Sequence, residues 1–151
     1  MMVKLCRGIV LALLWSLIWV QPNIARQEPD KVVVQHVLIG IKGKIAGKQI
    51  SRSKKEARTL AYEILDRAEA GEDFDALVKE YTDDRYPGRY VIINRDVSQL
   101  PGEGEYKRDD LAIKFGDLAF RLDVGEYGLA TFHAVSSPYG YHIIKRLEEP
   151  E

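Results

Sequence analysis

The chain has 151 residues, 46% of them hydrophobic and 30% charged, a composition that fits one soluble globular domain. Its single cysteine, Cys6, excludes an internal disulfide and a cysteine-based metal site. Lys4 and Arg7 are the only charges in residues 1–25, so the remainder has 20 basic and 23 acidic residues and a net charge of −3. That balance argues against a nucleic-acid partner, whose surface needs clustered Lys and Arg in excess.

Residues 1–27 are expected to be a targeting segment. Two basic residues precede residues 8–20, a run of thirteen in which Ser16 is the one polar side chain. A helix of that length spans ~20 Å, short of the ~30 Å of bilayer hydrocarbon, which favours a signal peptide over a membrane span. An uncleaved membrane tether through residues 8–20 is the alternative. Residues 28–151 are therefore expected to form an exported domain, periplasmic or extracellular.

Residues 32–41 read VVVQHVLIGI, an apolar run rich in β-branched side chains. Such a run predicts a strand buried on both faces, which His36 alone interrupts with a titratable group. A second apolar strand, predicted over residues 141–147, carries His142 near its start. Two histidines on central strands are the first indication of a functional site.

Two helices are predicted between these strands. Ser53 and Glu56 form a capping box that opens the first helix, and Gly71 ends it because glycine adopts the left-handed conformation readily. Asp73 caps a second, short helix with an apolar face over residues 74–81.

The C-terminal half adds two more strands and a helix to the prediction. A strand over residues 89–94 is followed by a polar loop over residues 95–107 and a helix from Asp109 or Asp110 to Leu122. Residues 129–135 and 141–147 then pair as a hairpin. The order β-α-α-β-α-β-β predicts an α+β fold: a four-stranded, largely antiparallel sheet with helices packed around it, and the first and last strands adjacent.

At this point the chain resembles the parvulin-type peptidyl-prolyl cis/trans isomerases, also called rotamases. The resemblance runs from about Val34 to Leu147 and rests on five pieces in the family's order. They are Gln35-His36-Val37-Leu38-Ile39, Ala70-Gly71-Glu72-Asp73-Phe74, Tyr81-Thr82-Asp83-Asp84, Ala119-Phe120-Arg121-Leu122 and Tyr139-Gly140-Tyr141-His142-Ile143-Ile144-Lys145.

The resemblance implies an isomerase that assists the folding of exported proteins. It acts on proline-containing unfolded or extended polypeptides, with no cofactor, and stabilises a twisted X–Pro amide without a covalent step. It also implies three candidate catalytic residues. His36 and His142 match the family's paired histidines, expected as a hydrogen-bonded pair, and Asp84 falls beside the susceptible carbonyl, with Asp83 as the neighbouring alternative.

The resemblance further implies five substrate-binding residues. Tyr90, Leu111 and Phe115 correspond to the apolar wall of the proline pocket, and Ser137 and Tyr139 to polar positions before the last strand. No metal site is expected, because no two histidines have ligand spacing within one element.

The sequence also departs from the family pattern. It has Gly88-Arg89-Tyr90-Val91 where the family usually has Gly-Asp-Leu-Gly, and Tyr139 where Ser or Thr is usual. These departures keep a second function open: a parvulin-like chaperone or peptide-binding module with little or no turnover. The loop over residues 42–52 holds four cations, Lys42, Lys44, Lys48 and Arg52. If it borders the groove, we expect acidic residues before proline to be favoured; the alternative is a solvated loop.

Overall fold

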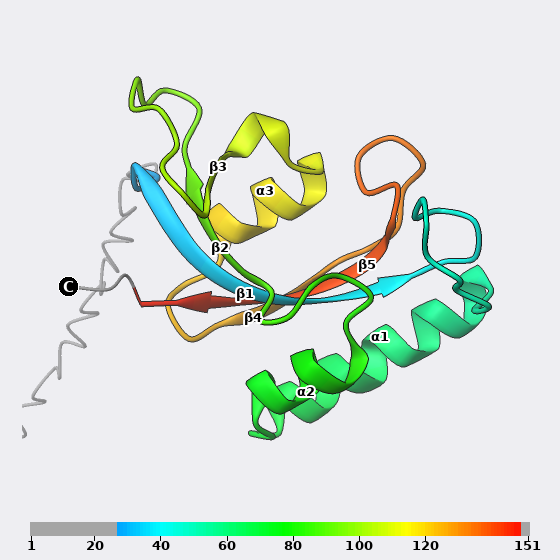
Figure 1. The fold of residues 1–151 in the computed structure, drawn as a ribbon. Helices are drawn as coiled ribbons and strands as arrows, with labels where there is room; N and C mark the ends of the chain where they lie inside the picture. The colour runs from blue at the N-terminus through cyan, green and yellow to red at the C-terminus, as the bar shows by residue number, and fades with distance from the viewer. Residues whose placement is uncertain (1–26, 149–151) are drawn as a thin grey trace, which may run out of the picture.

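A computed structural model describes residues 27–148. It shows one five-stranded sheet in the order β3-β2-β1-β5-β4, with α3 on one face and α1 and α2 on the other (Figure 1). The predicted targeting segment lies outside the described residues except for Gln27. Within the described part, no helix is both long enough and apolar enough to cross a bilayer.

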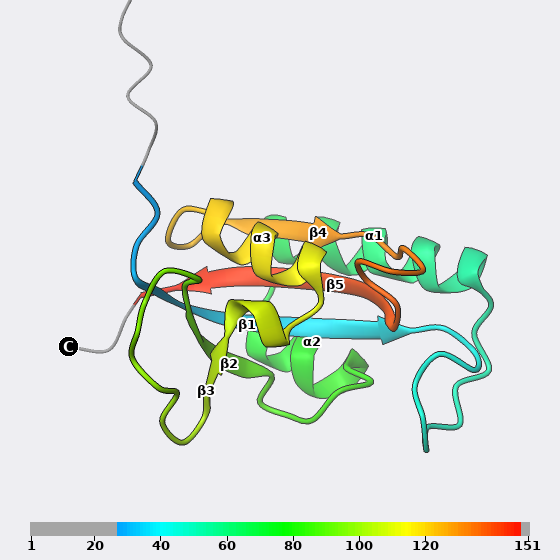
Figure 2. The same ribbon diagram turned by 90° about the horizontal axis from the view of Figure 1, so that it is seen from above.

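The central strand is β1 (Lys31–Gly40), which is buried along nearly its whole length. It pairs antiparallel with β2 (Arg89–Ile93) on one side and with β5 (Gly140–Leu147) on the other. The prediction that the first and last strands are adjacent is confirmed. Seen from above, β1 and β5 run side by side through the middle of the molecule (Figure 2).

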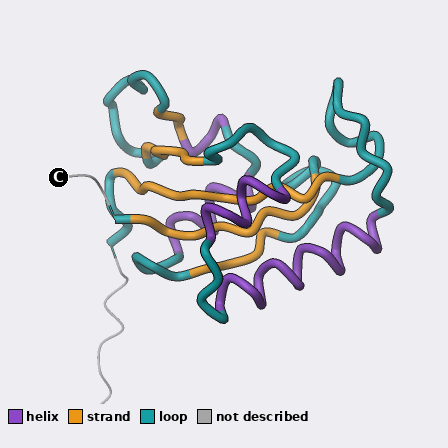
Figure 3. The backbone as a smooth tube through the Cα atoms, turned by 60° about the horizontal axis from the view of Figure 1, so that its bottom comes forward, coloured by secondary structure: helices purple, strands orange, loops and turns teal. Residues whose placement is uncertain are grey.

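Alternate residues of β1 and β5 face different helices. One face carries Val37, Ile39 and Ile143 against α1 (Lys54–Glu69) and α2 (Phe74–Tyr81), where they form a continuous apolar core. The other face packs Val34 and Ile144 against α3 (Ile113–Arg121). Figure 3 shows α1 extending along the sheet. His36 and His142 lie on the α3 face, which is therefore the face that carries the site.

The caps predicted for the first two helices are confirmed. The Ser53 hydroxyl accepts from the Glu56 N–H at 3.2 Å, and the Glu56 carboxylate accepts from the Ser53 N–H at 2.8 Å. Gly71 follows α1 with φ of 92°, the left-handed conformation. The Asp73 carboxylate caps α2 by accepting from the Asp75 N–H.

The prediction of four strands is wrong by one. β3 (Glu105–Lys107) lies inside the segment predicted as a loop and adds a parallel edge strand to β2. With three polar or half-buried residues, β3 is too short to give a strand pattern in the sequence. It forms because the edge of β2 is free to pair with it. The sheet remains antiparallel in its other three pairings.

Two further bounds differ from the prediction. β4 spans Tyr127–Ala130 instead of residues 129–135, because the chain after Ala130 turns away to contact the start of α3. The helix predicted from Asp109 or Asp110 begins at Ile113, after a separate 3₁₀ turn over Arg108–Asp110. Gly116, within α3, leaves room for Arg108, whose Cγ would be 3.0 Å from a Cβ at this position.

Candidate functional site

An open pocket of about 290 Å³ lies on the α3 face, near the end of the sheet where β1 leads into the loop over residues 41–52. It combines an apolar wall with a small polar group of side chains. The lining residues are His36, Leu38, Ile45, Asp84, Tyr90, Asp110, Leu111, Ala112, Phe115, Tyr139 and His142.

His36 is fixed from its backbone and its ring. It is 2% exposed, and both its backbone N–H (2.9 Å) and its Nδ1 (3.1 Å) contact the carbonyl oxygen of Gly88. A carbonyl only accepts, so Nδ1 carries the proton in this contact. Gly88 has φ of 65°, and a Cβ there would lie 2.5 Å from the His36 carbonyl oxygen. Glycine is therefore required at this position.

Asp84 points into the pocket between His36 and Tyr90. Its Oδ2 lies 3.3 Å from Nε2 of His36 and accepts a 2.7 Å hydrogen bond from the Tyr90 hydroxyl. The His36 and Tyr90 hydrogen bonds hold the pKa of Asp84 well below its usual range, although partial burial opposes this shift. Burial, with the Asp84 carboxylate as a further cause, raises the pKa of Tyr90. Asp84 therefore carries its charge at neutral pH.

His142 shows a different environment. Neither of its ring nitrogens has a hydrogen-bond partner within residues 27–148, and the residue is 6% exposed. Burial, with a smaller contribution from His36, lowers the pKa of His142 from 6.5 to about 3, so the ring is neutral. Phe115 packs edge-on against both histidines, with ring centroids 5.0 Å and 5.2 Å away.

The expected hydrogen bond between His36 and His142 is absent. Their ring centroids are 5.6 Å apart, and His36 is engaged by Gly88 and Asp84 instead. The sheet register explains the separation, because His36 pairs with Ile144 and His142 with Leu38, which places the two histidines diagonally. The two rings share a pocket as packed neighbours only.

The segment over residues 82–88 reaches the pocket because it completes the edge of β1. The Thr82 hydroxyl oxygen accepts from the backbone N–H groups of Leu38 (3.1 Å) and Asp84 (3.2 Å). The Asp83 N–H donates to the carbonyl of Leu38 at 2.8 Å. These bonds replace the strand pairing that β2 provides further back, and they direct Asp84 inward.

Asp83 has a separate structural task. Its carboxylate binds the Arg52 guanidinium through two contacts, at 2.5 Å and 3.1 Å, and accepts from the Gly40 N–H at 2.7 Å. Arg52 also donates to the Gly40 carbonyl. This Arg52–Asp83 clasp closes the base of the loop over residues 41–52, from which Ile45 reaches the pocket. Of the two adjacent aspartates, Asp84 is the one in the pocket.

Seven of the eight predicted site residues line this pocket, and Ser137 does not. Ser137 is fully buried, and its hydroxyl donates to the Gly140 carbonyl at 3.2 Å, which stabilises the turn before β5. The prediction missed four lining residues. Strand alternation from His36 points to Leu38, and proximity to Leu111 points to Asp110 and Ala112. No sequence pattern points to Ile45.

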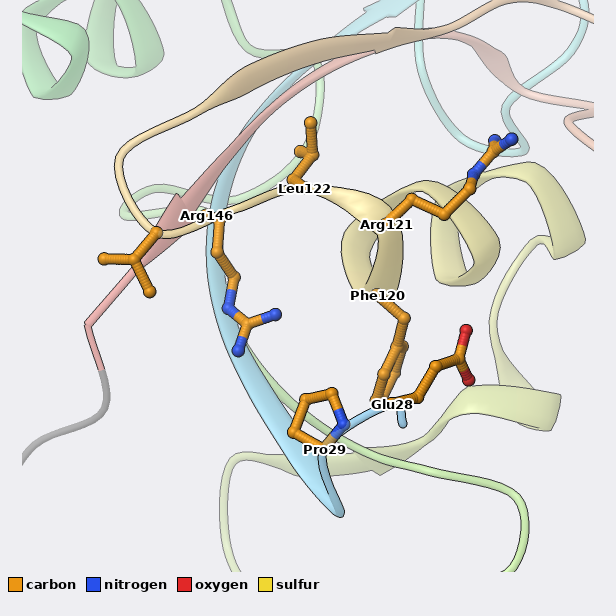
Figure 4. Close-up of a pocket in the computed structure, with 7 residues that line it drawn as sticks. Glu28, Pro29, Phe120, Arg121, Leu122 and Arg146 are labelled. Carbon is orange, nitrogen blue, oxygen red and sulfur yellow. The ribbon is translucent and has the colours of Figure 1, made fainter. Parts of the chain in front are cut away.

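A second hollow of about 220 Å³ lies at the opposite end of α3. In Figure 4 the Arg146 side chain extends towards Pro29, whereas Arg121 points away. The hollow shares no lining residue with the pocket. Across residues 27–148, no cluster of His, Cys, Asp and Glu side chains is arranged to hold a metal ion.

Residues 21–150 match the family described as the PPIC-type PPIase domain. The foldase protein PrsA of Bacillus subtilis is 33% identical over 110 residues, which cover 73% of this chain and 32% of that protein. The chaperone SurA of Chromohalobacter salexigens is 33% identical over 114 residues, covering 74% of this chain and 21% of that protein.

Among solved structures, the solution structure of TbPIN1 matches with a TM-score of 0.57. It covers 79% of this chain and 98% of the other, at 17% sequence identity, which is a likeness of fold. The matched part of the chain covers 32% of the length of PrsA and 21% of the length of SurA, so it corresponds to a third or less of these relatives.

Proposed function

The chain belongs to the PPIC-type PPIase domain family, the parvulin-type isomerases, and on that premise we propose that its pocket accelerates cis/trans isomerisation of X–Pro bonds in unfolded or extended polypeptides. One observation carries the proposal. A single pocket sets an apolar wall, formed by Leu111 and Phe115, against a polar group formed by His36, Asp84 and His142. The apolar wall can hold a proline ring, and the polar group can contact the amide that precedes it.

The chemistry requires no covalent step. Rotation about an X–Pro bond meets a barrier of ~20 kcal/mol, because resonance gives the C–N bond partial double-bond character. A site lowers this barrier by binding the twisted amide more tightly than either planar form. In the twisted state the nitrogen is more basic and the carbonyl has lost its conjugation, so groups fixed in advance around them favour that state.

Each pocket residue has a role in this proposal. Leu111, Phe115 and Tyr90 hold the proline ring in place. Asp84 stays ionised beside the amide, with His36 fixing its position. His142 remains neutral with both ring nitrogens unpartnered in the described structure, so it has a donor and an acceptor available for the bound amide.

The test is exchange spectroscopy on short X–Pro peptides with and without the protein. We expect faster cis/trans exchange with the chain, a strong reduction with Asp84→Asn, and no change with Asp109→Asn. Asp109 is the matched control because it is also an aspartate outside the α-helices and strands, but it pairs with Arg95 outside the pocket. Exchange that the wild-type chain leaves unaltered would refute the isomerase proposal.

If exchange is unaltered, the alternative function is binding of extended polypeptide without turnover. The exposed apolar side chains of Ile113, Val135 and Tyr139 favour it. The Lys114 N–H donates to the Ser136 carbonyl, which brings the first two residues close together, and Tyr139 lines the pocket itself. Peptide binding that shifts resonances of pocket residues, without faster exchange, would support this function.

We also propose that the domain, residues 28–151, works outside the cytoplasm. The support is the sequence pattern of residues 1–27: two basic residues followed by the apolar run over residues 8–20. Fusing residues 1–40 to a reporter that is active only after export tests this proposal. A reporter that stays inactive would contradict it. Sizing the mature N-terminus then separates a cleaved signal peptide from a retained tether.

A further inference from the structure

The charges around the pocket are unbalanced. Of the residues that line it, Asp84 and Asp110 are acidic and none is Lys or Arg. His142 adds no positive charge, because its pKa is lowered to about 3. His36 already lies against Asp84, so Asp110 is the lining carboxylate that a polypeptide entering this pocket meets without a partner in the described structure.

The basic loop over residues 42–52 does not restore the balance. Its Arg52 is engaged by Asp83 and by the Gly40 carbonyl in the clasp. Lys44 lies over the Phe132 ring, 5.8 Å from its centroid. The residue that this loop sends to the pocket is Ile45. No cation of the loop lines the pocket, so the lining does not support the expectation that the loop favours acidic residues before proline.

Asp110 differs from the other carboxylates nearby. Asp109 binds Arg95, Asp117 binds Arg95 and Arg108, and Asp84 binds Tyr90 and approaches His36. Within residues 27–148, no hydrogen bond or ion pair is formed by the Asp110 side chain. It is the lining carboxylate whose charge is left for a bound molecule.

A second feature of the same pocket also points to a bound molecule. His142 is more than nine-tenths buried, and both of its ring nitrogens lack partners in the described structure. A buried polar group of this kind costs stability unless something satisfies it. An occupant with a peptide group would supply the missing hydrogen bonds and would lie within the same lining that includes Asp110.

Resting on the proposed function, we infer that Asp110 is a specificity-determining residue that favours polypeptides with Lys or Arg next to the proline. The ammonium or guanidinium group of such a residue pairs with the exposed Asp110 carboxylate, whereas a neighbouring Glu is repelled. Exposed charge pairs are weak, so the preference is at most several-fold. Added salt reduces it, because screening acts within ~8 Å at physiological ionic strength.

The test compares peptides that differ only at the residue before proline, with Lys, Ala or Glu at that position, and a second set varied after proline. Exchange spectroscopy at low and high salt gives kcat/KM for each peptide. We expect Lys over Glu by about three- to ten-fold at low salt in at least one set, with Ala between them, and a smaller ratio at high salt.

Two variants assign the effect to one residue. Asp110→Asn should bring the Lys-to-Glu ratio close to one while the Ala peptide is still turned over. Asp109→Asn makes the same change of net charge one residue away, at a carboxylate that pairs with Arg95, and should leave the ratio unchanged. Equal rates for Lys and Glu peptides with the wild-type chain, or equal loss of preference in both variants, would overturn the inference.

Failure of this inference is distinguishable from failure of the proposed function. Turnover of the Ala peptide without charge preference would refute the role of Asp110 and keep the isomerase. Absence of turnover for every peptide would refute the isomerase, and the same ratio would then be measured as binding affinity from shifts of the pocket resonances. No binding of any peptide would overturn both proposals.

Discussion

The α3 face of the sheet carries two buried polar clusters at its opposite ends, and they are built differently. At one end Arg108 is 5% exposed and donates to Glu28, Asn94 and Asp117, with its guanidinium 4.4 Å above the Phe120 ring. At the other end His142 is equally buried and its ring has no hydrogen-bond partner in the described chain. The first cluster satisfies nearly all of its polar groups within the fold, whereas the second contains a ring whose two nitrogens are satisfied by nothing in the described chain.

This difference gives a practical criterion. Protein interiors normally satisfy buried polar groups, so a group left unsatisfied costs stability and needs a reason. The Arg108 cluster meets the requirement except at Nε, and it ties the segment before β1 and the 3₁₀ turn to the middle of α3. Changes there should act on stability, whereas changes at His142 should act on ligands.

The largest effect should come from Arg108→Ala. It removes three charged hydrogen bonds and a buried packed side chain, so we expect the free energy of unfolding to fall by about 2–4 kcal/mol. Denaturant titration measures this loss. Arg95→Ala is the matched control, since Arg95 binds Asp109 and Asp117 from an exposed position and should cost below ~1 kcal/mol. Equal losses in the two variants would show that the buried Arg108 cluster contributes no more to stability than an exposed ion pair.

The pH dependence of stability comes next. The folded pKa of His142 is about 3 and its unfolded value is ~6.5, so the unfolded state binds more protons between these values. The free energy of unfolding should therefore fall as the pH drops below ~6.5, by up to ~1.4 kcal/mol per pH unit from this residue. Above pH 7 the residue has no such effect.

Subtracting the curve of His142→Leu isolates this contribution. Asp84, whose pKa is lowered in the fold, loses its own contribution only nearer pH 4, and it does so in both proteins. Parallel curves between pH 6.5 and 4.5 would show that His142 is solvated or partnered in the folded protein.

The same variant separates stability from activity. Above pH 7, His142→Leu removes a buried group without a partner, so the free energy of unfolding should stay within about 1 kcal/mol of the wild type or rise. If His142 binds the twisted amide through one hydrogen bond, kcat/KM for X–Pro peptides should fall about tenfold, which is ~1.4 kcal/mol of barrier. A stability loss as large as that of Arg108→Ala would place His142 among the structural groups.

The smallest effect should come from the Arg52–Asp83 clasp, which is a structural ion pair that also anchors a loop of the pocket. Arg52→Gln should lower the free energy of unfolding by about 1 kcal/mol, because the pair is bidentate but 29% and 17% exposed. It should also raise KM, since the loop that supplies Ile45 loses its anchor. Lys48→Gln, in the same loop, is the control. Strict additivity with Asp83→Asn would argue against the clasp.

Sequence patterns predicted the parts of the fold that depend on local chemistry. The apolar run around His36 predicts β1 because burial on both faces leaves a continuous signal, and the Ser53 and Asp73 caps predict the starts of α1 and α2. The family resemblance selected eight candidate site residues, and the fold places seven of them in one pocket.

What the sequence could not provide depends on tertiary contacts. β3 is three residues long and exists because the β2 edge is available beside it. Ile45 belongs to the pocket through the clasp between Arg52 and Asp83, two residues 31 positions apart. The choice between Asp83 and Asp84, and the diagonal placement of the two histidines, follow from hydrogen bonds along β1 that no residue pattern encodes.

One feature of the sheet bears on how the domain is attached to other chains. Val33 pairs with Leu147, so the described chain enters and leaves at one end of two neighbouring strands, ~5 Å apart (Figure 2). His36 lies three residues beyond Val33 along β1, ~10 Å from that pair. A unit with adjoining ends can be spliced into a longer polypeptide as a cassette without forcing its host apart. The pocket would then lie towards the end of the sheet opposite the attachment.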